Sequence, residues 1–309
     1  MTREEFEAGL AQVEREVTHR RAGVHGEGSI SWEVSRETAL FLAAGEATLL
    51  QLAHPFVAQA VATQSRTRDD PMKRFQRTFF HVFRVSFGDL DRAIVSARQI
   101  FAVHDRIFGT LDEALGKYPQ GHPWEALDPH ALYWVYATLV HSSLGTFDRM
   151  VRPLSREERD RYVAESRRFA LLFGVPPAML PRDHAEFVAI WDDWIASDRL
   201  AVGAHAKKTA ELLLTPSRLV PSAIARWFRP VTRALLPPRI REQYGDAGLA
   251  DDLILRSSVA VGRVAYRAFP ETLRWVPAYR EAERRVAGNA SPDRVGRFVH
   301  RRALQIILG

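Results

Sequence analysis

Apolar residues recur at steps of three and four along almost the whole chain, which is the spacing of one face of an α-helix. The alternation of single apolar and polar residues that marks a strand is not sustained anywhere. The pattern therefore predicts an all-α protein, with helices that begin and end near prolines and Asp-Pro pairs. The predicted helices cover residues 4–19, 35–64, 71–83, 90–108, 129–150, 156–172, 181–196, 202–214, 249–268 and 293–307.

The least polar stretch is residues 35–64, where Glu46 is the only formal charge between Thr38 and Ala62. By length alone it could span a membrane. Polar residues and Pro55 interrupt it, however, and proline breaks the hydrogen bonding of a helix. We therefore expect a buried central helix that is kinked at Pro55.

The chain changes character after Thr215, where it becomes proline-rich, basic and amphipathic. No linker, repeat or low-complexity tract separates the two parts. We expect one domain over residues 1–309, with a core at 30–200 and a packed C-terminal lobe at 215–309. The aromatic and basic stretch Trp227–Leu236 could lie on a membrane surface.

The amino-acid composition excludes several classes of protein. Hydrophobic residues make up 46% and charged residues 26% of 309 positions, which excludes a disordered or collagen-like chain. The absence of cysteine excludes disulfides, iron–sulfur clusters and cysteine nucleophiles. A net charge of +6 suits an anionic partner, but no basic–aromatic module predicts nucleic acid. The acidic, amphipathic N-terminus resembles no targeting peptide, so we expect a cytoplasmic protein.

Several catalytic motifs are absent from the sequence: the paired Glu-x-x-His of di-iron bundles, His-Glu-x-x-His, Gly-x-Ser-x-Gly and the phosphate-binding loop. The pairs Asp69-Asp70, Asp192-Asp193 and Asp251-Asp252 could belong to a magnesium-dependent terpenoid synthase. Each lacks the third aspartate of such clusters, which favours helix starts and solvated faces instead.

One histidine lies on a strongly apolar helical face. This face carries Ala97, Ile100, Phe101, His104, Ile107 and Phe108. The His104 imidazole is therefore expected to point into the core between Phe101 and Phe108. A neutral ring nitrogen there could ligate haem iron, with flat apolar neighbours on the porphyrin. The alternative is a hydrogen-bonded core histidine.

The preceding helix places Arg74, Arg77 and Thr78 on one face, since they occupy positions i, i+3 and i+4. Two arginines and a hydroxyl beside aromatic residues could hold haem propionates or polarise a bound oxygen species. The alternative is an amphipathic helix with a solvated basic edge.

Three further polar residues lie in apolar helices. His54 and His141 could be ligands or buried, hydrogen-bonded histidines. Glu46 is a candidate for a raised pKa, and hence for a base, or for pairing with an inward arginine.

The order of several segments resembles the MpaB-type oxygenase family, which shares its catalytic domain with the rubber oxygenases known as latex clearing proteins. The segments are LLQLAHPFVAQAVA, DPMKRFQRTF, VSFGD, VHDRIFG and LDPHALYWVYATLVHS, within residues 30–200, and the stretch Leu235–Gly245. The resemblance implies an all-α, globin-like core that carries haem b, with His104 as the proximal ligand and Arg74 and Thr78 on the distal side.

The sequence departs from the family at three positions. Arg77 stands where rubber oxygenases carry a lysine that can ligate iron. Because arginine stays protonated, we expect a sixth position that holds water or is open to dioxygen or peroxide. Tyr136 replaces a histidine common in the family, and a different histidine appears at His141. The family's acidic base is not reproduced at its spacing, since Glu46 lies further upstream.

We therefore expect a haem-b-dependent oxygenase that acts on an apolar substrate, such as an isoprenoid or a secondary metabolite. Arg74, Arg77 and Thr78 would act on the distal side, and His104, Arg74, Phe101 and Phe108 would hold the cofactor. The alternative function is a non-catalytic helical protein that binds a lipid or another hydrophobic ligand.

Overall fold

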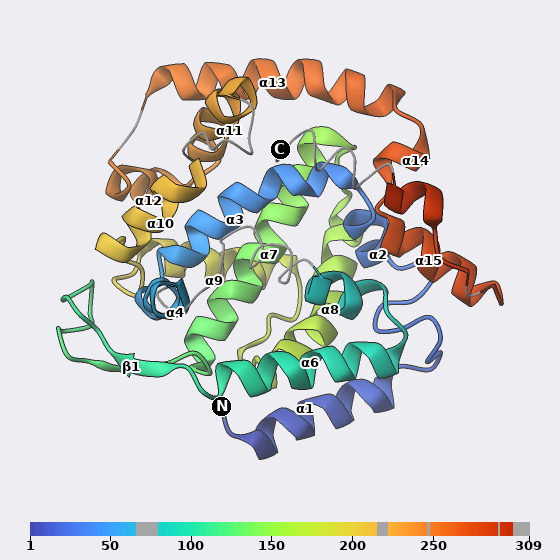
Figure 1. The fold of residues 1–309 in the computed structure, drawn as a ribbon, viewed down its shortest axis with the longest axis horizontal. Coiled ribbons are helices and arrows are strands. Elements are labelled where there is room, and N and C mark those ends of the chain that lie inside the picture. Colours follow the sequence, from blue (N-terminus) through green and yellow to red (C-terminus); the bar gives the residue numbers. More distant parts are fainter. Residues whose placement is uncertain (66–79, 215–221, 246–247, 290, 299–309) are drawn as a thin grey trace.

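A computed structural model describes residues 1–65, 80–214, 222–245, 248–289 and 291–298. The mostly helical prediction is confirmed, with one small β-sheet added (Figure 1). The elements are α1 (Arg3–Glu16), α2 (Ile30–Ser35), the 3-10 helix η1 (Thr38–Leu42), α3 (Ala43–Leu52), α4 (Pro55–Ser65), α6 (Leu90–His104), β1 (Phe108–Thr110), β2 (Pro123–Glu125), α7 (Pro129–Met150), α8 (Arg156–Phe173), η2 (Pro177–Met179), α9 (His184–Ala196), α10 (Ala204–Leu214), α11 (Ser222–Ala234), α12 (Pro238–Gln243), α13 (Leu249–Ala268), α14 (Glu271–Arg274) and α15 (Pro277–Val286). Residues 80–87 and 294–298 are also helical.

Local sequence fixes many helix ends. The Asp128 carboxylate accepts a hydrogen bond from the Ala131 backbone at 2.9 Å and so begins α7. α8 begins with a reciprocal capping box between Ser155 and Glu158. It ends at Gly174, whose φ of 96° suits a residue without Cβ. These caps explain why the ends of α7 and α8 are close to those predicted from the sequence.

The apolar stretch at residues 35–64 is divided into η1, α3 and α4. The change of direction predicted at Pro55 is present, since this proline is the first residue of α4, but the single kinked helix predicted over residues 35–64 is wrong because the chain forms separate helices there. Among the described residues, no single helix is long and apolar enough to cross a membrane. The segments Thr38–Leu52 and Pro55–Thr63 reach that length only together, with a bend of 103° between them.

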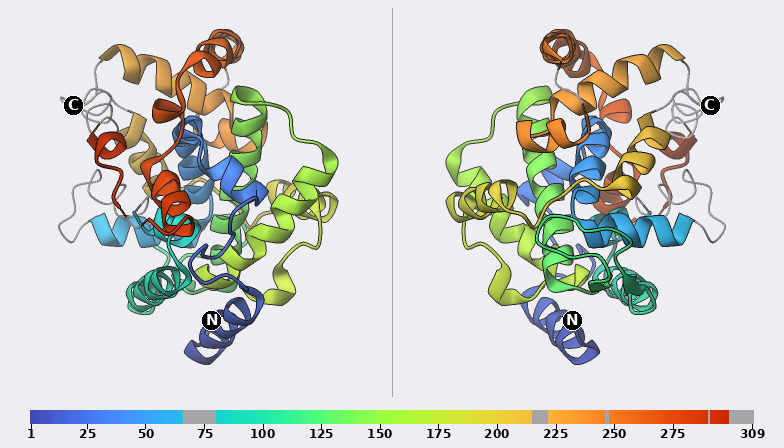
Figure 2. Two further views of the ribbon diagram at one scale, coloured as in Figure 1. Left: turned by 90° about the vertical axis from the view of Figure 1, so that its right-hand side faces the viewer. Right: turned by 90° about the vertical axis from the view of Figure 1, so that its left-hand side faces the viewer.

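Helices α3 and α7 form the centre of the fold, and the other helices surround them (Figures 1 and 2). The Trp134 indole donates a 2.7 Å hydrogen bond to the Leu50 carbonyl, which lies in the last turn of α3. The same indole stacks with Trp191 and Trp194 of α9, with centroids 5.0 and 5.3 Å apart. Trp134 thus joins three helices in one aromatic core.

The helix predicted to reach Phe108 ends earlier, at His104. Tertiary packing explains the difference. Ile107 is buried in a separate small cluster with Trp124, and its carbonyl accepts from the Ala126 backbone at 2.8 Å. The chain is therefore drawn into strand β1, where Phe108 pairs with Glu125 in an antiparallel register and is 71% exposed.

The C-terminal helices pack back onto the centre: α11 contacts α3 and α13, and α13 also contacts α7. In α11, Val231 is buried, and Leu236 just beyond it is buried as well. Most of the apolar surface in the stretch Trp227–Leu236 is therefore used in internal packing rather than presented on the outside, although Trp227 is 37% exposed.

A buried carboxylate fastens the C-terminal part to the core. Glu37 accepts hydrogen bonds from the Tyr266 hydroxyl at 2.8 Å and the Trp275 indole at 3.2 Å. The Arg274 guanidinium also donates to it at 3.2 Å. Because these donors surround Glu37, its charge is compensated although the side chain is only 1% exposed.

We predict that Tyr266→Phe lowers the free energy of unfolding by about 1–3 kcal/mol, because Glu37 loses a buried donor. Urea denaturation measures this. Tyr118→Phe is the matched control, since no hydrogen bond of the Tyr118 hydroxyl is found in the described part of the chain. Equal stability of both variants would contradict the role given to Glu37.

Candidate functional site

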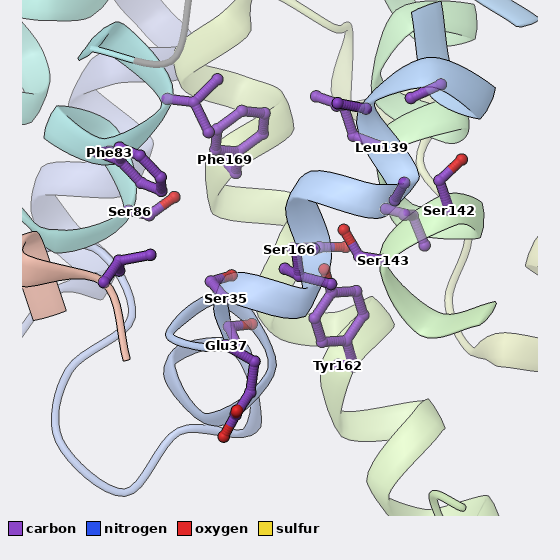
Figure 3. Close-up of a pocket in the computed structure, with 18 of the residues that line it drawn as sticks. Ser35, Glu37, Phe83, Ser86, Leu139, Ser142, Ser143, Tyr162, Ser166 and Phe169 are labelled. Carbon is purple, nitrogen blue, oxygen red and sulfur yellow. The ribbon is translucent and has the colours of Figure 1, made fainter. Parts of the chain in front are cut away.

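A cavity of about 130 Å³ lies beside the central helices, between α2, α3, residues 80–87, α7 and α8. Figure 3 shows Phe83 and Ser86 on one side of it and Leu139 and Ser142 on the other. Its wall is mainly apolar, with a few hydroxyl groups. The lining residues are His25, Ser31, Ser35, Glu37, Leu40, Phe41, Ala43, Ala44, Ala47, Val82, Phe83, Ser86, Tyr136, Leu139, Val140, Ser142, Ser143, Tyr162, Ser166, Phe169 and Val276.

Tyr136 lines this cavity from α7. Its hydroxyl lies 2.8 Å from the Ser166 hydroxyl, which in turn donates to the Val163 carbonyl at 2.8 Å. Burial raises the pKa of Tyr136 to about 12, partly offset by Ser166 and the charge of Arg167. Tyr136 therefore stays protonated at neutral pH and can supply a hydrogen bond, but not a base.

The cavity wall also holds polar atoms without partners. Nδ1 of His25 and the hydroxyl of Ser31 are buried and make no hydrogen bond among the described residues. Burial, helped by the charge of Arg168, lowers the pKa of His25 to about 3. Sequence reasoning missed His25 because it lies in a glycine-rich loop, where no helical periodicity indicates which way a side chain points.

His104 is the last residue of α6, near this cavity but not in its lining. Its Nδ1 atom is buried without a hydrogen-bond partner, and burial lowers its pKa to about 4. The ring meets Phe173 edge-on at 5.9 Å, and Phe173 stacks with the cavity residue Phe169 at 6.5 Å. His104 is thus a neutral imidazole, separated from the cavity wall by aromatic rings.

The structure separates the other residues predicted beside His104. Phe101 is buried and stacks on Phe6 of α1 at 4.4 Å. Phe108 lies in β1 and does not share a helical face with His104. The predicted distal residues Arg74, Arg77 and Thr78 lie outside the described residues.

His54, between α3 and α4, is a fully buried histidine. Its Nδ1 accepts from the Phe56 backbone at 3.3 Å, while Nε2 is buried without a partner in the described chain. The ring lies among Phe56, Tyr118 and Trp194. Burial, together with the charges of His130 and Lys117, lowers the pKa of His54 to about 3. These aromatic contacts favour the interpretation of His54 as a buried core histidine rather than a ligand.

Glu46 and His141 meet where α3 contacts α7. His141 Nε2 lies 3.6 Å from Glu46 Oε1, and the imidazole stacks on Trp191 at 3.9 Å. Burial raises the pKa of Glu46 to about 7, with Arg149 and Ser142 opposing it. Burial and Arg149 lower the pKa of His141 to about 4. Because burial favours both neutral forms, this contact is not an ion pair near neutral pH.

The two described aspartate pairs have arginine partners. Asp193 lies 2.8 Å from Arg199, and Asp252 lies 2.9 Å from Arg241. Asp69 and Asp70 are outside the described residues. Within the part of the chain that the structure describes, no group of three or more histidine, aspartate and glutamate residues could hold a metal ion.

The fold and the cavity define a mostly helical protein with an apolar interior and buried, neutral imidazoles. Residues 32–276 match the family described as "ER-bound oxygenase mpaB/B'/Rubber oxygenase, catalytic domain". The match covers most of the chain, so the protein belongs to this family, and oxygenase is its general class of activity. No curated protein and no solved structure matches the chain.

We predict that Glu46→Gln stabilises the protein increasingly as the pH rises. Folded Glu46 keeps its proton up to about pH 7, whereas the unfolded side chain loses it near 4.5. The parent protein therefore loses stability as the pH rises from 4.5 to about 7, because the folded interior disfavours the ionised Glu46 carboxylate. Relative to the parent, the variant should gain up to about 3 kcal/mol between pH 4.5 and pH 8.

Denaturant unfolding at several pH values measures this gain. Glu211→Gln is the control, because Glu211 is exposed and its replacement should leave the pH dependence unchanged. A stability difference between Glu46→Gln and the parent that is constant over the whole range would contradict a raised pKa.

Proposed function

We propose that this protein is a haem-b-dependent oxygenase acting with dioxygen on a small apolar substrate, and that His104 would ligate the haem iron. Membership of the oxygenase family supports the general activity. The observation that carries the cofactor assignment is the buried, unpartnered Nδ1 atom of His104. A location in the cytoplasm stays a prediction from the sequence.

The properties of His104 suit a metal ligand. Iron is ligated by an unprotonated ring nitrogen, and a pKa of about 4 keeps the ring neutral throughout the physiological range. The position at the end of α6 leaves the ring against Phe173 rather than within a hydrogen-bond network. When bound, haem would supply the redox-active iron needed to activate dioxygen.

The cavity, which Phe169 and Phe173 separate from His104, would bind and orient the substrate. Leu139, Val140 and Phe169 offer an apolar wall, which favours a substrate with little polar surface. The Tyr136 hydroxyl donates its proton to Ser166, and its oxygen can accept one hydrogen bond from the substrate and so fix an orientation. On the family resemblance, we assign Arg74, Arg77 and Thr78 as hydrogen-bond donors that would act toward dioxygen.

The test is the absorption spectrum of protein produced with added haem precursor. We expect a Soret band in the parent, and more than about a tenfold loss of bound haem per protein in His104→Ala. Free imidazole in the buffer should restore part of the band, because it can occupy the space left by the side chain. A merely structural defect would not respond to imidazole.

His25→Ala is the matched control, since His25 is also a neutral histidine with a buried, unpartnered Nδ1 and lines the cavity. It should retain haem. Loss of haem in His25→Ala with retention in His104→Ala would overturn the assignment of the ligand. A colourless parent that purifies with bound lipid would instead favour a non-catalytic hydrophobic-ligand carrier.

A further inference from the structure

Helix α13 presents an apolar face on the outside of the molecule. It runs along one edge of the fold, on the side away from α1, with no described element over it (Figures 1 and 2). Leu249, Leu253 and Val264 are 86%, 66% and 73% exposed, and Val261 is 71% exposed. Single exposed apolar residues are ordinary, but four along one face of a helix mark an interaction surface.

The packing of the opposite face fixes which way α13 is turned. Tyr266 is buried and donates to Glu37. Gly262 faces Met150 so closely that a Cβ there would lie 3.1 Å from the methionine methyl group. The Arg267 guanidinium donates to the Val151 carbonyl at 2.7 and 3.0 Å. These contacts hold α13 by its inner face. The fold therefore turns the apolar face of α13 outward.

The charges of α13 are distributed unevenly. Arg256 and Arg263 are seven residues apart, so they lie along one edge of the apolar face, whereas Arg267 is bonded to Val151. The two acidic residues of α13 lie in its first turn, where Asp251 is 3.9 Å from Arg233 and Asp252 is 2.9 Å from Arg241. Beyond that turn, all charged residues of α13 are arginines.

We propose that α13 is a membrane-docking helix that lies flat on an anionic lipid bilayer. Its leucine and valine side chains would enter the interface between headgroups and acyl chains, and Arg256 and Arg263 would contact lipid phosphates. An apolar face with a cationic edge is the arrangement found in helices that bind membrane surfaces. At 20 residues, α13 offers a face about 30 Å long.

The charge distribution favours lipid over a second copy of this chain. Pairing α13 with itself would bring the arginines of two copies into one interface, while Asp251 and Asp252 already pair with Arg233 and Arg241. Anionic headgroups would instead neutralise these arginines. Trp227 of α11 lies at the border of the same surface, since it is 37% exposed and its indole donates to Ser258 of α13 at 2.7 Å. Partly exposed tryptophan is common at membrane interfaces.

Sedimentation of the full chain with lipid vesicles tests the proposal. Vesicles of phosphatidylcholine with one quarter phosphatidylglycerol should retain the protein, and pure phosphatidylcholine vesicles should retain less. Raising the salt concentration should weaken the binding.

The double variant Leu253→Glu, Val264→Glu should reduce partitioning by at least about tenfold, because two carboxylates would enter the lipid interface. Arg256→Gln should reduce mainly the preference for anionic vesicles.

The matched control is Val95→Glu, Val103→Glu, which changes two exposed valines of α6 at the opposite end of the molecule (Figure 2). It should bind vesicles as the parent does, and thermal unfolding should show all variants folded. The proposal is overturned if the parent stays in the supernatant with anionic vesicles, or if the α6 control loses binding equally. Light scattering that shows a dimer broken by the α13 substitutions, without vesicle binding by the parent, would assign this face to a second copy.

Discussion

The contact between α3 and α7 is the interaction on which the rest of the structure depends. Three side-chain contacts follow it: Trp134 with the Leu50 carbonyl, Gln51 with Thr138 at 3.2 Å, and Glu46 with His141. Helix α7 also contacts α8, α9 and α13, and α3 also contacts α10 and α11. One wall of the cavity is formed by the same two helices, so a change along this contact would alter both the core and the candidate site.

Desolvation links this core to the proposed chemistry. Burial keeps His25, His54, His104 and His141 neutral, because the interior disfavours an imidazolium ion. Neutral imidazoles can accept a proton or ligate a metal, which charged ones cannot. The same effect leaves Glu46 protonated through much of the acidic range. The apolar interior thus keeps its histidines in the neutral form that metal coordination requires. It also favours the binding of an apolar substrate.

The C-terminal part connects the surface to this interior through Glu37. This carboxylate lines the cavity and also receives the Tyr266 hydroxyl from the inner face of α13. The helix with the exposed apolar face is therefore held by a residue of the cavity wall. If α13 docks on a bilayer, the candidate site would lie close to the lipid surface, where apolar compounds concentrate.

The sequence by itself determined where most helices lie. Periodicity and capping residues act within a few positions, so α7 and α13 occupy the residues predicted for them, and the break at Pro55 follows from the missing backbone N–H. The family was also readable from the sequence, because its motifs occur in a fixed order, and the match over residues 32–276 confirms that resemblance.

Only the tertiary structure decided which faces of these helices are covered. The α6 helix ends at His104 because Ile107 packs in another cluster, His25 reaches the cavity from an irregular loop, and α11 is covered where α13 is exposed. Each of these outcomes depends on contacts between residues far apart in the chain. Local periodicity shows that a helix face is apolar, but the free energy of burying that face depends on which other element packs against it.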